Sequence, residues 1–214
     1  MQQLTADDIK LIILEIKKIV DTNKETLTEL DSLMGDGDLG FTMTKAFSAA
    51  NDEAGKSEER IPGKLLTRLG MIIAKTAPST MGTLIATGFM KGGKAIEQSG
   101  EIGPEELAIF FETFARSMME RGKSAPGNKT IIDTIYPAAM ALRVEANAHH
   151  SMEQGITAAH TAALNGLEAS VKMKAQHGRA AYYQDKSIGM QDGGATVGTY
   201  IVEGFYKHIT NPQN

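Results

Sequence analysis

The sequence contains no cysteine and no tryptophan among its 214 residues. Without cysteine the chain has no disulfides, no thiol nucleophile and no cysteine-ligated metal, so any bound metal must be held by oxygen or histidine. Aromatic residues make up only 6% of the chain, whereas alanine, isoleucine, leucine and methionine are plentiful. This composition favours helices over β-sandwiches.

Long apolar segments and strongly basic segments are also missing. The most apolar run, residues 81–90, is far shorter than the ~20 residues of a membrane span, and residues 1–8 lack the pattern of a secretory signal. Lysine and arginine total 22 against 26 acidic residues, and no stretch is basic enough to follow a phosphate backbone. We therefore expect a cytoplasmic protein with no membrane partner and no nucleic-acid partner.

Apolar residues recur at helical spacing along almost the whole chain, and no segment alternates convincingly like a strand. Helix starts are indicated by caps at Thr5, Ser79 or Thr80, and Ser151, and by prolines at residues 62 and 104. The predicted helices cover residues 6–30, 41–51, 62–75, 80–98, 104–122, 130–150 (kinked at Pro137), 151–177 and 195–205.

This pattern predicts an all-α fold of about eight helices in a single domain over residues 1–214, because no composition shift marks a linker. Glycine-containing loops near residues 35, 122 and 190 each follow a long helix. In an up-and-down antiparallel bundle such loops meet at one end. We expect the functional site at that end.

Asp31, Asp36 and Asp38 place three carboxylates within eight residues at the end of a predicted helix. Gly35 and Gly37 let the backbone turn tightly enough for the three to converge. Converging carboxylates repel one another unless a hard cation neutralises them, and oxygen ligands suit Mg²⁺ or Ca²⁺. The alternative is an acidic turn that merely ends a helix.

Three better-known motifs fail on chemical grounds. Glycines at 35, 37 and 40 have the dinucleotide-fingerprint spacing but follow a helix rather than a strand. A calcium loop starting at Asp36 has phenylalanine where it needs glycine and glutamate. Residues 88–95 resemble a Walker A loop but end in Ala95, which has no hydroxyl for Mg²⁺. We expect Gly82, Gly88 and Gly92 to permit close helix contact instead.

Two later loops run into predicted helix starts, where unpaired N–H groups and the helix dipole favour an anion. The first covers residues 122–130. The second, residues 178–194, contains Arg179 as a candidate phosphate or nucleotide contact. An ordinary turn and a surface arginine are the alternatives. The five histidines have no ligand spacing, so surface or helix-end positions are expected for them.

Four motifs occur together in the order and spacing of one known family. They are DSLMGDGDLG (31–40), PGNKTIID (126–133), GRAAY (178–182) and SIGMQDGGA (187–195). On these motifs the chain resembles the nucleotide-binding L subunits of bacterial dihydroxyacetone kinases over essentially its whole length. The resemblance implies an eight-helix antiparallel barrel with ADP or ATP at one end, its phosphates held through two Mg²⁺ ions.

By this resemblance Asp31, Asp36 and Asp38 are the expected metal ligands. The expected nucleotide contacts are Leu39, Gly40, Phe41, Thr42, Ser79, Thr80, Met81, Gly122, Thr130, Ile131, Arg179, Asp192, Gly193 and Gly194. No catalytic residue is expected beyond the metal site, because phosphoryl transfer relies on metals and positioned donors. Many family members have histidine at position 39, Ser-Gly near residues 79–80 and His-x-Asp-Pro-Gly at residues 190–194, and this chain departs from those patterns.

The resemblance also implies two protein partners. A phosphohistidine on an M-type subunit would rephosphorylate bound ADP, and the product would phosphorylate dihydroxyacetone on a sugar-binding K-type subunit. A homodimer is left open. Two alternatives are a non-catalytic adaptor that keeps the nucleotide fold and binds a regulator, and an ATP-dependent kinase subunit for another short keto-sugar. The intact carboxylates favour an enzyme, because an adaptor has no need to keep groups that repel one another.

Overall fold

The computed structural model describes residues 2–211, and within that range the chain forms nine α-helices and one 3₁₀ helix. The elements are α1 (Ala6–Thr22), α2 (Lys24–Met34), α3 (Leu39–Lys56), α4 (Pro62–Thr76), α5 (Thr80–Ala95), α6 (Pro104–Gly122), α7 (Ile132–Asn147), α8 (Met152–Val171), the 3₁₀ helix η1 (Arg179–Ser187) and α9 (Gly193–Thr210). The predicted all-α class is confirmed. Residue 1 and residues 212–214, the ends of the predicted 1–214 domain, lie outside the described range.

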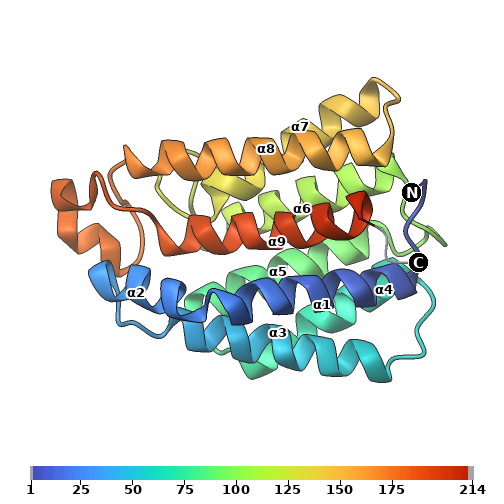
Figure 1. Cartoon of the computed structure of the whole chain (residues 1–214), viewed down its shortest axis with the longest axis horizontal. Coiled ribbons are helices and arrows are strands. Elements are labelled where there is room, and N and C mark those ends of the chain that lie inside the picture. The colour runs from blue at the N-terminus through green and yellow to red at the C-terminus, as the bar shows by residue number, and fades with distance from the viewer. Residues whose placement is uncertain (1, 212–214) are drawn as a thin grey trace.

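Eight of these α-helices form a closed ring in which neighbours along the chain are neighbours in space. Helix α1 packs against α3, each helix from α3 to α8 packs against the next, and α9 packs against α1. Figure 1 shows the long helices side by side, running back and forth along one axis. Helix α2 is an addition to the ring and contacts α3 and α9. The predicted antiparallel arrangement is therefore confirmed.

Alternation of helix direction decides which ends of the helices meet. Helices α3, α5, α7 and α9 all begin at the end of the barrel that carries α2 and η1, on the left in Figure 1. Helix α1 begins at the opposite end, where α9 finishes. Four helix N-termini, each with a partial positive charge, are thus gathered at one end.

Local sequence sets where several helices begin. Thr5 and Ser151 cap α1 and α8, and each forms a reciprocal capping box, with Asp8 and Gln154 respectively. The Ser79 hydroxyl accepts a hydrogen bond from the Gly82 N–H at the start of α5, at 3.0 Å. Prolines occupy the first position of α4 and α6. These starts agree with the prediction.

Several predicted boundaries are wrong: α3 ends at Lys56 instead of residue 51, α8 at Val171 instead of residue 177, and α9 at Thr210 instead of residue 205. Two further differences change the number of elements. Periodicity predicts one helix over residues 6–30, but the chain breaks at Asn23, whose side chain donates to the Ile19 carbonyl at 2.8 Å and so ends α1. The apolar spacing continues on both sides of the break, which hides it in the sequence. Residues 178–194, predicted as a loop, contain η1. Helix α7 passes through Pro137 as one element.

Six of the seven phenylalanines fill the barrel interior as one cluster. Its members are Phe47, Phe89, Phe110, Phe111, Phe114 and Phe205, all fully buried. The ring centroids of Phe89 and Phe114 are 5.2 Å apart in an edge-to-face arrangement, and those of Phe111 and Phe205 are 5.1 Å apart. The seventh, Phe41, is 62% exposed. In residues 2–211 no helix is both long enough and apolar enough to cross a membrane.

Glycines on α5 let that helix approach the phenylalanines of α6. A Cβ atom at Gly88 would lie 2.6 Å from the ring of Phe114, and one at Gly92 would lie 2.7 Å from the ring of Phe110. Both distances are shorter than any real contact. Gly88 and Gly92 therefore serve helix packing, as predicted. The prediction is wrong for Gly82, where a Cβ atom would lie 2.1 Å from the Ala77 carbonyl just before α5 rather than against another helix.

Replacing Phe89 by alanine should lower the free energy of unfolding by about 3–5 kcal/mol, because the side chain is fully buried among other rings. Phe41→Ala is the matched control, and it should change the free energy of unfolding by less than about 0.5 kcal/mol. Urea denaturation of both variants measures the difference. Similar losses for the two would contradict the placement of the core.

Candidate functional site

A cleft of about 1020 Å³ opens at the end of the barrel where α3, α5, α7 and α9 begin. Its walls come from α2, from the first turns of those helices, from the loop between α6 and α7, and from the start of η1. All three glycine-containing loops contribute, so segments more than 150 residues apart in sequence meet here, as the up-and-down arrangement predicts.

Asp31, Asp36 and Asp38 form the acidic wall of the cleft. One carboxylate oxygen from each lies within 4.8 Å of the others. Asp31, on the last turn of α2, also accepts the backbone N–H groups of Asp38 and Leu39, at 2.9 and 3.2 Å. The same carboxylate therefore faces the cluster and holds the turn that carries its other two members.

Glycine is required in this turn for steric reasons. A Cβ atom at Gly35 would lie 2.1 Å from a carboxylate oxygen of Asp31, so any side chain there would displace the cluster. Gly37 has a φ of +75°, a conformation that side-chain-bearing residues rarely adopt. The two glycines thus allow the tight turn that the sequence predicts.

Arg179, the first residue of η1, brings a positive charge to the cluster. Its guanidinium lies 2.6 Å from a carboxylate oxygen of Asp36. Burial raises the pKa of Asp38, and the carboxylates of Asp36 and Asp31 raise it further, whereas Arg179 opposes this rise. The cluster offers three carboxylate oxygens close to one another and carries a net negative charge. Such a set of ligands fits a hard divalent cation such as Mg²⁺.

Helix N-termini that line the same cleft offer N–H groups to an anion. Thr80 and Met81 lie in the first turn of α5, and Gly193 and Gly194 lie in the first turn of α9. Asp192 caps α9, its side chain accepting the Ala195 N–H at 2.7 Å. Because these turns belong to long helices, the helix dipole adds to the attraction for a phosphate.

Apolar side chains cover the remaining wall of the cleft. Met81, Leu84 and Ile131 line it from α5 and from the start of α7. An acidic cluster, a set of N–H donors and an apolar wall in one cleft match the three parts of a metal–nucleotide complex, namely cation, phosphates and base.

Most of the predicted site residues lie together in this cleft. Those that line it are Asp31, Asp36, Asp38, Leu39, Thr42, Ser79, Thr80, Met81, Gly122, Thr130, Ile131, Arg179, Asp192, Gly193 and Gly194. Gly40 and Phe41, predicted to lie under the phosphates, are not among the lining residues. Gly40 faces α2, where an added Cβ would lie 2.2 Å from the Lys24 carbonyl, and Phe41 points into solvent.

Several residues of the cleft were not predicted. Lys129 lines it yet is only 2% exposed, and His177 lines it with a ring nitrogen 3.1 Å from the Asn128 side chain. His208 lies in the last turn of α9, a helix-end position as predicted, but it is buried and lies 2.9 Å from Asp8, a contact that was not predicted. That pair joins residues 200 positions apart, so no local pattern reveals it.

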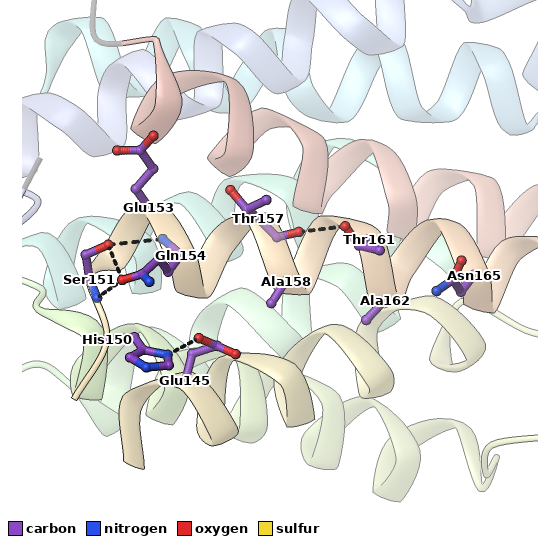
Figure 2. A pocket seen from close by; sticks show the side chains of 10 residues that line it. All are labelled: Glu145, His150, Ser151, Glu153, Gln154, Thr157, Ala158, Thr161, Ala162 and Asn165. Atoms are coloured by element: carbon purple, nitrogen blue, oxygen red, sulfur yellow. Dashed lines mark hydrogen bonds and ion pairs between the residues drawn. The ribbon is translucent and has the colours of Figure 1, made fainter. Parts of the chain in front are cut away.

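A second groove, of about 810 Å³, lies on the outside of the barrel between α7 and α8 (Figure 2). In Figure 2 dashed lines join His150 to Glu145, Ser151 to Gln154 and Thr161 to Thr157, whereas Glu153 and Asn165 have no partner among the residues drawn. His150 lies 2.5 Å from Glu145, and Ser151 and Gln154 are bound together in the capping box of α8. These groups already serve local structure, so the groove has no comparable set of ligands.

The all-α barrel and its acidic cleft are those of a Dak2 domain. Residues 33–207 match the DAK2 domain family, and the chain belongs to that family. The chain is 31% identical over 185 residues to the ADP-binding subunit DhaL of the PEP-dependent dihydroxyacetone kinase of Escherichia coli, with 86% of this chain and 88% of that subunit aligned. The predicted family resemblance is therefore confirmed.

More distant relatives contain this domain as one part of a longer chain. A D-erythrulose kinase of Mycolicibacterium smegmatis is 29% identical over 175 residues, which are 81% of this chain and 30% of that kinase. The native dihydroxyacetone kinase of C. freundii has the same fold, with a TM-score of 0.70 and 21% identity over 94% of this chain and 34% of its own. A second structure of that kinase, in complex with AMP-PNP and Mg²⁺, has the same TM-score. The predicted membership of a kinase family is confirmed.

Asp192 should make stability depend on pH. Burial raises its pKa from the usual 3.8 to about 6, although the Ala195 N–H and the charge of Lys129 oppose the rise. The folded protein thus holds this proton more tightly than the unfolded chain. The resulting stabilisation is present below about pH 4 and is lost as the pH rises through 6, by about 2 kcal/mol in total for a partly buried group.

Asp192→Asn isolates this effect, because asparagine keeps an acceptor for the Ala195 N–H but does not ionise. Urea denaturation between pH 4 and 7 should show the wild-type protein losing about 2 kcal/mol relative to the variant as the pH rises. Parallel pH profiles for the two proteins would contradict the assigned burial of the carboxyl group.

Proposed function

We propose that this protein is the ADP-binding subunit of a dihydroxyacetone kinase and carries a phosphoryl group between two partner proteins. The observation that supports the proposal most directly is the cluster of Asp31, Asp36 and Asp38 in a cleft where four helices begin, in a chain of the Dak2 family. The E. coli relative is named as an ADP-binding subunit and aligns along nearly its whole length.

In this proposal the three carboxylates hold the nucleotide through Mg²⁺, with two ions expected. Bound Mg²⁺ would neutralise phosphate charge as the phosphoryl group is transferred. The N–H groups at the starts of α5 and α9 orient the phosphates, and Met81, Leu84 and Ile131 pack against the base. The chain supplies position and charge and needs no nucleophile of its own.

Arg179 has two roles in the same cycle. Its guanidinium pairs with Asp36 and offsets part of the repulsion within the cluster. A cation held by Asp36 would weaken that pairing and leave the guanidinium able to contact a phosphate oxygen. Arg179 is 65% exposed, so its side chain can move between the two partners at little cost.

The reaction requires two partners. A phosphohistidine on an M-type subunit gives its phosphoryl group to bound ADP, and that group then passes to a hydroxyl of dihydroxyacetone on a K-type subunit. The carboxylates, N–H donors and apolar wall of the cleft are assigned to the nucleotide in this proposal, and the sugar is assigned to the K-type subunit. Erythrulose kinases among the relatives make another short keto-sugar the alternative acceptor.

Reconstitution tests this division of labour. The purified protein alone should not phosphorylate dihydroxyacetone, whereas a K-type subunit and a phosphorylated M-type donor together should restore turnover, measured as formation of dihydroxyacetone phosphate. Replacing the phosphoprotein donor by ATP, and dihydroxyacetone by erythrulose, separates the alternatives. Robust turnover by this chain alone would overturn the proposal.

Thermal unfolding tests the metal site. Mg²⁺ and ADP together should raise the melting temperature, since ligand at a hundredfold excess over its Kd stabilises the folded state by about 2.7 kcal/mol. Either one alone should raise it much less. Asp36→Asn should abolish the rise and the turnover, and Asp52→Asn, an exposed aspartate later on α3, should retain both. If Asp36→Asn keeps the full rise, Asp36 is not a metal ligand.

A further inference from the structure

Lys129 is one of the most deeply buried large side chains of the protein, although it belongs to the loop between α6 and α7. Its backbone has a φ of +58°, which is uncommon for a residue with a side chain. Its ammonium donates to the carbonyl groups of Ser170, Val171 and Met190, at 2.8, 3.4 and 2.6 Å. A lysine has three N–H donors, and each has an acceptor here.

The three carbonyl groups belong to two segments that are about 20 residues apart in sequence. These segments are also joined by the Gly189 N–H, which donates to the Val171 carbonyl at 2.8 Å. Ser170 and Val171 are the last residues of α8, where the helix dipole favours a cation, and Met190 lies in the loop that leads into α9. One ammonium thus joins the α6–α7 loop, the end of α8 and the segment of residues 190–194. That segment contains Asp192, which caps α9, and the glycines that line the cleft.

Direct contact with a phosphate is not the role that this geometry gives Lys129. Its N–H groups point at carbonyl oxygens, and its side chain is 2% exposed. Burial lowers the pKa of its ammonium, whereas the carboxylates of Asp192 and Asp133 oppose this. In its charged form the ammonium donates all three hydrogen bonds.

We propose that Lys129 is a positioning residue of the nucleotide site, whose ammonium holds residues 190–194 so that the start of α9 faces the cleft. The inference rests on the proposed function for its link to nucleotide binding, but the holding of residues 190–194 is a property of the protein without ligand. Affinity for Mg-ADP depends on the charge at position 129, even though Lys129 does not touch the nucleotide.

The absence of cysteine from the chain makes a direct test possible. In Lys129→Cys the new thiol is unique, so alkylation in denaturant followed by refolding modifies position 129 alone. Bromoethylamine restores an ammonium at the end of a lysine-like side chain, and bromopropane gives a neutral side chain of the same length. Lys129→Met provides a second neutral variant that needs no refolding.

Three measurements then decide the proposal. Helical circular dichroism reports folding, hydrogen exchange without ligand reports residues 189–195, and calorimetry reports the Kd for Mg-ADP. We expect the neutral forms to fold, to exchange at least tenfold faster at residues 189–195 and to bind Mg-ADP at least tenfold more weakly. The aminoethylated form should return to within about threefold of wild type in both exchange and affinity.

Leu107→Ala is the control for loss of stability alone, since Leu107 is buried near the start of α6 at the opposite end of the barrel. It should leave the Kd within twofold of wild type. Equal affinities for the charged and neutral forms, unchanged exchange at residues 189–195, or an equal loss in Leu107→Ala would each overturn the proposal. If wild type itself fails to bind Mg-ADP, the proposed function fails, while the exchange data still test the positioning role.

Discussion

Alternation of helix direction around a closed ring is the constraint on which the site depends. Because each helix of the ring packs against the next one in sequence, every second helix must begin at the same end. Helices α3, α5, α7 and α9 thereby bring four N-termini together without any dedicated anion-binding loop. The buried phenylalanine cluster fills the ring and keeps this geometry, so the core and the cleft depend on the same packing.

The acidic and the electropositive parts of the cleft have different origins. Asp31, Asp36 and Asp38 come from eight consecutive residues and are held by local hydrogen bonds from the turn to Asp31. The N–H donors come from helices far apart in sequence and are brought together by the fold alone. A mutation in the turn should therefore affect the acidic cluster selectively, whereas a packing defect between α5, α7 and α9 should affect the donors.

Local patterns predicted the helices, their caps and the carboxylate cluster, because each depends on residues within one or two turns. The break at Asn23 was missed because apolar spacing continues across it, and no glycine or proline marks it. Lys129 and the pair of His208 with Asp8 were missed for another reason, since their partners are 41 to 200 residues away. From the sequence alone, a lysine in a polar loop is expected to be exposed to solvent, because the segments that bury it are distant in sequence.

Two departures from the common family pattern prove to be in contact. Leu39, at the start of α3, packs against Gly193, at the start of α9, and a Cβ atom at Gly193 would lie 2.7 Å from a Leu39 methyl group. Any side chain at position 193 would therefore press on this leucine. Leucine at 39 and glycine at 193 are complementary, because the leucine fills the space that the glycine leaves. Their contact joins the start of α3, which follows the carboxylate turn, to the start of α9, so the acidic cluster and the N–H donors of the cleft are packed against each other at this point.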